Sequence, residues 1–140
     1  MNTELSIAVN GQGLYEITSD VAAVVKSSGL NDGLATVYIR HTSASLVIQE
    51  NADPAVQRDL EAFLARVVPE GDSADNPVPY THVEEGADDM PAHIKSALTQ
   101  THLSIPVVDG RLALGTWQGV FLWEHRHRAN QRRVIVNLLS

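Results

Sequence analysis

Apolar and polar residues alternate over much of the chain, which is the pattern of half-buried β-strands. The sequence opens with two such stretches, ELSIAV and LYEIT, and the turn-forming residues NGQG between them predict a first hairpin. Further on, LATVYIRHTSASLVIQEN is rich in β-branched and aromatic residues and predicts two strands with a break near TSAS. The alternation places Val37, Ile39 and His41 on one face of the first of these strands, so His41 ends an apolar face.

Three segments have the spacing and the end signals of helices. The first is expected from about residue 19 to residue 28, between Ser/Asp start signals and a glycine stop. The strongest helix is ADPAVQRDLEAFLARVVPEG, with Asp53 as its cap and Pro54 in the first helical position. A short helix is expected to begin at Pro91.

The last third of the chain is again strand-like. Its four runs are LSIPVV, RLALGTW, GVFLWEHRH and RRVIVNLL, and Asp109-Gly110 between the first two predicts a hairpin. Residues 72–90 show no periodicity, and a polar loop of this length in a small domain is usually functional or disordered. The order of elements predicts an α+β fold with mainly antiparallel sheet in a single domain, residues 1–140.

The composition of the chain limits its expected location, the residue types available for a metal site or catalysis, and the classes of partner. No apolar run reaches the roughly 18 residues that cross a membrane, and the N-terminus lacks the features of a signal peptide, so we expect a soluble cytoplasmic protein without membrane contact. The chain has no cysteine, so a metal site or acid–base chemistry must use His, Asp and Glu. The net charge of −7 argues against a nucleic-acid partner. Five of the ten basic residues fall in the last thirty positions, where they could hold an anionic substrate or meet acidic residues across a subunit boundary.

The segment HVEEGADDMPAH contains two histidines, His82 and His93, that bracket four carboxylates without a Lys or Arg. A loop that folds back could bring both imidazoles to one divalent ion. Four side chains could supply a third ligand: His41, Glu85, Asp88 and Asp89. From the spacing alone, a solvated acidic loop is the favoured alternative.

Other polar residues are candidates for a ligand site. Asn51 and Asp53 could bind a ligand, although helix capping alone explains Asp53. Glu124 interrupts an apolar strand face and could act as a general base or as the partner of an ion pair. His125 and His127 lie on the opposite face of that strand, which favours packed or surface histidines over metal ligands.

Three segments carry a resemblance to a known family: RHTSASLVIQENADP, HVEEGADDMPAHIKSAL and LSIPVVDGRLALGTWQGVFLWEHR. The motif GTWQG, with five residues between its Gln and Glu124, is specific in combination with the histidine and carboxylate block. In this order and spacing the segments resemble the YjbQ-like family of small bacterial and archaeal proteins, described as the secondary thiamine-phosphate synthase family. The resemblance covers nearly the whole chain.

The resemblance implies curved antiparallel sheets, a homotrimer, and a metal ion at His41, His82 and His93. The ion would be zinc or a similar divalent ion, with Mg²⁺ as the alternative. The same motifs imply a set of residues that line the site. This set contains Asn51, Asp53, Asp88, Asp89, Gln118 and Glu124, without individual roles. As our own assignment, we expect Asn51, Asp53, Asp89 and Glu124 in catalysis, and Asp88, Gln118 and Arg126 in substrate binding.

The implied activity joins hydroxymethylpyrimidine diphosphate to thiazole phosphate with release of pyrophosphate, so the partner is a small phosphorylated substrate. Two alternatives stay open. One is a metal-dependent hydrolase of a small phosphorylated metabolite, with Glu124 or Asp89 as base. The other is a trimeric module that binds a metal or an anion and has no catalytic activity.

Overall fold

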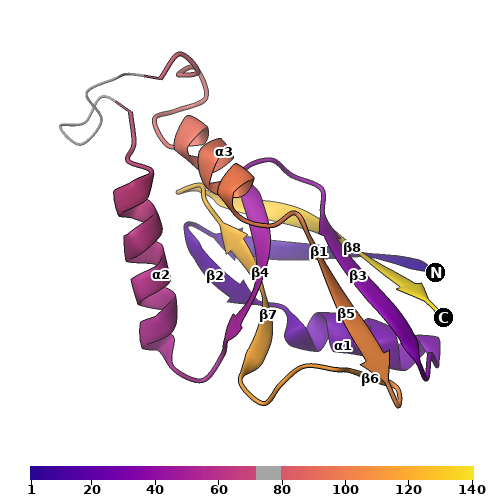
Figure 1. Cartoon of the computed structure of the whole chain (residues 1–140). Helices are drawn as coiled ribbons and strands as arrows, with labels where there is room; N and C mark the ends of the chain where they lie inside the picture. The colour runs from indigo at the N-terminus through magenta and orange to yellow at the C-terminus, as the bar shows by residue number, and fades with distance from the viewer. Residues whose placement is uncertain (72–79) are drawn as a thin grey trace.

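Two antiparallel sheets form the frame of the protein (Figure 1). A computed structural model of the chain describes residues 1–71 and 80–140. The large sheet has the strand order β1-β8-β3-β5-β6 and the small sheet the order β2-β7-β4. The strands are β1 (Asn2–Asn10), β2 (Gly13–Glu16), β3 (Gly33–Ile39), β4 (Ala44–Glu50), β5 (His102–Val108), β6 (Arg111–Leu112), β7 (Gln118–Glu124) and β8 (Ala129–Leu139). The helices are α1 (Thr18–Ser28), α2 (Pro54–Val67) and α3 (Asp89–Leu98).

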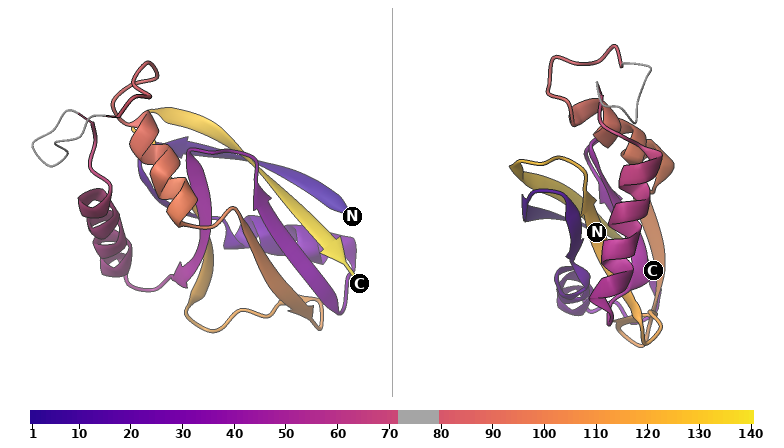
Figure 2. Two further views of the ribbon diagram at one scale, coloured as in Figure 1. Left: turned by 45° about the horizontal axis from the view of Figure 1, so that its top comes forward. Right: turned by 90° about the vertical axis from the view of Figure 1, so that its left-hand side faces the viewer.

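The core contains the apolar faces of both sheets and the inner face of α1. Val37 and Ile39 of β3 are buried, whereas Tyr38 between them is 48% exposed on the outer face of the large sheet. α1 contributes Val21, Val24 and Val25 to the same core. A smaller cluster of Leu64, Val68 and Trp123 holds α2 against the small sheet. The two chain ends lie together at the end of the large sheet, away from α2 (Figure 2).

The α+β prediction is confirmed, and so are most of the expected elements. α1 and α2 occupy the predicted segments, and the Asp53 carboxylate accepts a hydrogen bond of 2.9 Å from the Ala55 amide at the start of α2. The hairpin at Asp109-Gly110 joins β5 and β6, and both residues have positive φ as such a turn requires. α3 begins at Asp89, two residues before the predicted start at Pro91.

The predicted first hairpin is wrong. β1 pairs with β8 and β2 pairs with β7, so the turn at Gly11 leads from one sheet into the other. The signal for a turn was present, but local residues do not determine which strand pairs with which. β8 offers all nine residues of β1 a partner, whereas β2 has only four residues. The two strands around TSAS likewise belong to different sheets.

In the part of the chain that the structure describes, no helix is both long and apolar enough to cross a membrane. Of the loop predicted over residues 72–90, residues 72–79 lie outside the described residues. The remainder leads directly into α3 and carries His82.

Candidate metal centre

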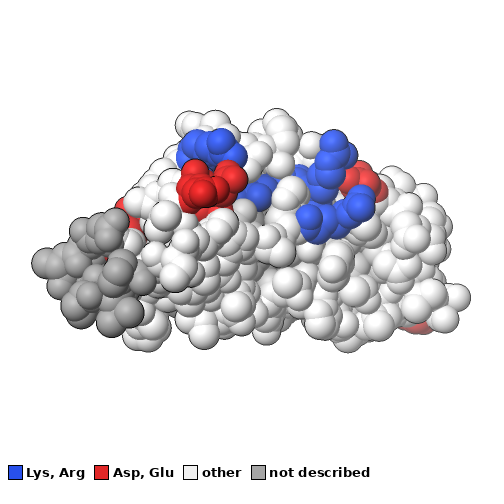
Figure 3. Space-filling view, turned by 90° about the horizontal axis from the view of Figure 1, so that it is seen from above, with Lys and Arg blue, Asp and Glu red and all other residues white. Residues whose placement is uncertain are grey.

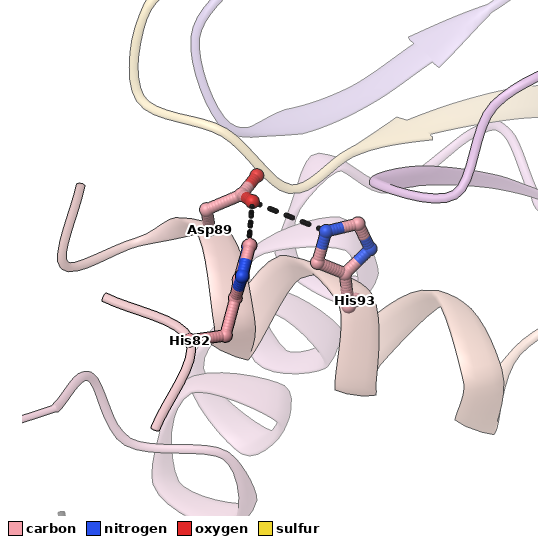
Figure 4. A group of neighbouring side chains, drawn as sticks. All are labelled: His82, Asp89 and His93. Atoms are coloured by element: carbon pink, nitrogen blue, oxygen red, sulfur yellow. Dashed lines mark hydrogen bonds and ion pairs between the residues drawn. The ribbon is translucent and has the colours of Figure 1, made fainter. Parts of the chain in front are cut away.

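His82, Asp89 and His93 converge at the start of α3 (Figure 4). Asp89 and His93 are four residues apart, so they lie on the same face of the helix, and His82 reaches them from the preceding loop. Oδ2 of Asp89 lies 2.7 Å from Nε2 of His82 and 3.1 Å from Nε2 of His93. Within residues 1–71 and 80–140, these three are the group whose potential ligand atoms all lie within 4.8 Å of one another. Two imidazoles and a carboxylate are a donor set that suits zinc and similar ions.

The contacts of His93 call for a positive charge at this point. Its Nδ1 lies 2.9 Å from the backbone carbonyl oxygen of Thr42, which only accepts hydrogen bonds, so Nδ1 carries a hydrogen. Nε2 of the neutral ring then presents a lone pair to the Asp89 carboxylate, which is also an acceptor. A second proton on the ring or a cation must therefore lie between Nε2 of His93 and the Asp89 carboxylate. A divalent ion meets this requirement, and the Thr42 contact is the type of outer hydrogen bond that orients histidine ligands.

Arg126 binds the carboxylates of Asp88 and Asp89. Its NH1 lies 2.7 Å from Oδ1 of Asp89, its Nε lies 3.0 Å from Oδ2 of Asp88, and its NH2 donates to the carbonyl oxygen of Glu85 at 2.8 Å. Arg126 is only 8% exposed. This guanidinium, expected to bind substrate, therefore holds the loop and α3 in position.

The charges of this network keep both carboxyl groups ionised. Burial alone would raise the pKa of Asp89, but the hydrogen bond from His82 and the charge of Arg126 outweigh it and lower that pKa. The pKa of Asp88 is also lowered, since the Arg126 hydrogen bond and the His127 amide outweigh burial. The hydrogen bond to Asp88 raises the pKa of Arg126 in turn. Asp89 is thus available as an anionic ligand.

Glu124 is fully buried in an ion pair with Arg132. Its Oε1 accepts from Nε of Arg132 and its Oε2 from NH2, both at 2.6 Å. Oε2 also accepts the backbone N–H of Arg126 at 3.1 Å. Of the two alternatives for Glu124, the structure shows the ion pair. Its role as a base stays a prediction, and both carboxylate oxygens are already engaged.

His41 lies near His93 but outside the group of three. Its Nε2 accepts the backbone N–H of Arg133 at 2.8 Å, and its Nδ1 lies 3.3 Å from NH1 of Arg132. Burial and the charge of Arg132 lower the pKa of His41, which favours the neutral ring. His41 and His93 both line a hollow of about 190 Å³. The role of His41 as a metal ligand stays a prediction.

The structure separates the other expected residues from this centre. Asn51, Asp53 and Gln118 lie at the end of the small sheet where β4 finishes and β7 begins, whereas Glu124 is paired with Ala44 at the opposite end. A strand of this length spans about 20 Å. Asp53 caps α2, and Gln118 accepts a hydrogen bond of 2.8 Å from the Gly115 amide. Within one chain, these residues form a second group of expected site residues.

Sequence reasoning missed Thr42, which orients His93, and Arg132, which neutralises Glu124. As a metal ligand, it named Asp89 only as one of four candidates for the third position, and it otherwise expected Asp89 in catalysis. The spacing of Asp89 and His93 was available as a signal, but it becomes informative only if the helix begins before Pro91. Arg132 gave no local signal because its partner belongs to another strand.

Comparisons with known proteins agree with this fold and these motifs. A family model described as "UPF0047 protein YjbQ-like" matches residues 3–140. A UPF0047 protein of Synechocystis sp. is 58% identical over 134 residues, which cover 96% of this chain and 88% of the relative. The UPF0047 protein YjbQ of Escherichia coli O157:H7 is 41% identical over 135 residues, covering 96% of this chain and 94% of the relative.

Solved structures show the same similarity. An uncharacterized conserved protein of the YjbQ/UPF0047 family from Clostridium acetobutylicum superposes with a TM-score of 0.86 at 36% identity, covering 98% of this chain and 99% of that chain. A conserved hypothetical protein from Thermus thermophilus gives a TM-score of 0.84 at 36% identity with the same coverage. The chain belongs to the YjbQ-like (UPF0047) family.

Proposed function

We propose that this protein is a divalent-metal-dependent enzyme that acts on a small phosphorylated substrate, with His82, Asp89 and His93 as the metal ligands. The observation that carries the proposal is the position of His93 between two acceptors, Thr42 O and Asp89 Oδ2. The ring can be neutral there only if a cation lies between Nε2 and the carboxylate. Arg126 supports the site by holding Asp89 in place from the opposite side.

The proposed reaction is the one that the sequence motifs imply. The ring nitrogen of thiazole phosphate uses its lone pair to form a bond to the methylene carbon of hydroxymethylpyrimidine diphosphate. The bond from that carbon to the diphosphate oxygen breaks, and pyrophosphate leaves with the bonding electrons. A divalent ion bound at the centre would supply charge neutralisation for the leaving group. The chain's own contribution is to orient the ligands through Thr42 and Arg126.

The donor set favours a second candidate. Two histidines and one carboxylate, with room for a further ligand, are also used by hydrolytic zinc enzymes. A metal-dependent hydrolase of a phosphorylated metabolite is therefore the alternative. It differs from the first proposal in its products: a transfer joins two organic substrates, whereas a hydrolase releases phosphate from one.

We also propose that the protein assembles as a homotrimer. The two groups of expected site residues lie at opposite ends of the small sheet, and a symmetric assembly offers a way for the Gln118 end of one copy to approach the metal centre of another. Sedimentation equilibrium on the wild type measures the mass, and a monomer at micromolar concentration would exclude this assembly.

The metal content of the tag-free protein tests the centre. After exposure to mixed divalent ions and removal of free metal, we expect about one zinc-like ion per chain in the wild type and much less in His82→Ala and His93→Ala. His127→Ala is the matched control, because this exposed histidine contacts Glu70 and not the centre. The metal content of His41→Ala distinguishes the two candidates for the third ligand. If the variant retains the metal, Asp89 is the third ligand; if the variant loses the metal, His41 is a ligand.

Product analysis with the pyrimidine diphosphate, the thiazole phosphate and a panel of phosphorylated metabolites separates the reactions. Thiamine phosphate formation that is absent in His82→Ala supports the transferase. Phosphate release from one substrate supports the hydrolase. Metal binding without turnover on any substrate, combined with a lower melting temperature after metal removal, would leave a binding module without catalytic activity.

A further inference from the structure

A second hollow opens beside the metal centre, on the outer face of the large sheet where β3 ends. Its volume is about 550 Å³, and it is lined by Tyr38, Ile39, Arg40, His41, Thr42, Ser43 and Thr101. It shares three lining residues, His41, Thr42 and Thr101, with the smaller hollow that reaches His93. The two hollows thus adjoin the same short stretch of backbone, and Thr42 is also the residue that orients His93.

Arg40 lines this hollow, and Arg133 adjoins it through its backbone N–H, which donates to Nε2 of the lining residue His41. NH1 of Arg133 lies 3.1 Å from Oε1 of Glu4, and NH1 of Arg40 lies 3.6 Å from Oε2 of the same carboxylate. The two arginines start from neighbouring backbone positions, since the Arg40 amide donates to the Arg133 carbonyl at 3.1 Å. Seen from above the view of Figure 1, the larger groups of basic side chains each lie beside acidic ones (Figure 3). The arrangement already holds one anionic group, the Glu4 carboxylate, between two cations.

These arginines differ from the two buried ones in their freedom to exchange partners. The side chains of Arg40 and Arg133 are 53% and 63% exposed, and that of Glu4 is 37% exposed. Exposed ion pairs of this kind contribute little to stability. The side chains of Arg126 and Arg132, in contrast, are 10% and 3% exposed and each is fixed by carboxylates. An incoming dianion can therefore displace Glu4 from Arg40 and Arg133 at little cost in stability.

We infer that this hollow binds the phosphate or diphosphate group of an organic substrate between Arg40 and Arg133, with the organic group against the ring of Tyr38. Phosphate carries more charge than the Glu4 carboxylate and has more acceptor oxygens, and guanidinium groups match its geometry. Tyr38 precedes Arg40 by two residues on the same face of the extended chain and is 48% exposed, so its ring is available for stacking. The placement of this subsite beside the metal centre rests on the proposed function, but anion binding to the arginines does not.

Isothermal titration of metal-free protein with inorganic pyrophosphate, in the presence of a chelator at low salt, tests the anion site. We expect binding in the wild type that weakens with added salt, and a loss of about tenfold or more in Arg40→Gln/Arg133→Gln, because charged hydrogen bonds are removed. Arg58→Gln, which removes an exposed positive charge from α2, is the matched control and should bind as the wild type does. Glu4→Gln should bind pyrophosphate more tightly, since the competing carboxylate is gone.

The role of Tyr38 is measured with phenyl phosphate as the probe. Tyr38→Ala should weaken phenyl phosphate and leave pyrophosphate unchanged, whereas equal weakening of both would contradict a stacking role. No pyrophosphate binding in the wild type, or equal binding by the double arginine variant, would overturn the inference. His82→Ala keeps the two proposals apart: it should lose metal yet still bind pyrophosphate, so failure of the metal centre leaves this result intact.

Discussion

Asp89 and His93 face each other across one turn of α3, with Oδ2 of the carboxylate 3.1 Å from Nε2 of the imidazole. The same oxygen also contacts His82, and the other oxygen contacts Arg126. One carboxylate thus joins both histidines to the arginine that anchors the loop. This central position makes Asp89 the residue on which metal binding and local stability should depend together.

Asp89→Asn should therefore lower zinc affinity by at least the roughly tenfold to hundredfold that loss of an outer-shell partner typically costs, because it removes a direct anionic ligand. It should also lower the melting temperature of the metal-free protein, since Arg126 loses one of its two carboxylates. Zinc titration against a competing chelator and thermal unfolding in chelator measure the two effects. Asp88→Asn is the control, because it weakens the Arg126 pair without touching the histidines. Unchanged zinc affinity in Asp89→Asn would remove this carboxylate from the ligand set.

Glu124→Gln tests the buried ion pair. Removing one partner leaves the Arg132 guanidinium buried without its countercharge, which typically costs about 3–5 kcal/mol of unfolding free energy. Urea denaturation at neutral pH measures the loss. The double variant Glu124→Leu/Arg132→Met should be more stable than Glu124→Gln, because no charge is left unpaired. A stable Glu124→Gln protein without turnover would instead indicate a catalytic role for this carboxylate.

Variants of Asp53 can distinguish a role in capping α2 from a role in catalysis. Its side chain caps α2 through the Ala55 amide, so Asp53→Ala should cost about 1 kcal/mol of unfolding free energy. Asp53→Ser retains a capping oxygen and should restore most of that stability. If Asp53 only caps the helix, Asp53→Ser retains turnover as well. A variant that is stable but inactive would support the catalytic role expected from the sequence motifs.

Local signals account for the elements of the fold and not for its pairing. Asp53-Pro54 gave the start of α2 and Asp109-Gly110 gave the hairpin of β5 and β6, because both features depend on residues that are adjacent in sequence. The partner of β1 is β8, at the far end of the chain, and no turn residue encodes that choice. Hence the turn after β1 was predicted and its hairpin was wrong.

The candidate site also has features that the sequence predicted and contacts that it did not. His82 and His93 were predicted to approach each other, and the structure brings them to one carboxylate oxygen. The partner of Arg126 was not predictable, since a charged residue at a strand end is equally compatible with substrate, solvent or an internal carboxylate. Only the tertiary structure shows that Asp88 and Asp89 form ion pairs with the Arg126 guanidinium. It also shows that the guanidinium groups of Arg40 and Arg133 are exposed.

His125 should make the protein sensitive to acid. It is buried with Nε2 at 2.9 Å from the Ser45 hydroxyl, and burial, together with the charges of Lys95 and Arg132, lowers its pKa from 6.5 to about 3. Between these values the unfolded chain binds a proton at this site and the folded chain does not. The free energy of unfolding should therefore decrease as the pH falls from 6.5, by up to about 1.4 kcal/mol per pH unit from this group.

The two carboxyl groups whose pKa values are lowered do not account for the same interval. Asp88 and Asp89 have lowered pKa values, so their stabilising contribution is complete above their ordinary pKa near 3.8 and is lost only below it. Urea denaturation at about pH 7, 6 and 5 therefore avoids the interval in which these two carboxyl groups titrate. His125→Gln should lower stability at neutral pH but flatten its decline toward acid. Parallel declines in the wild type and His125→Gln would show that His125 is not the group that resists protonation in the folded protein.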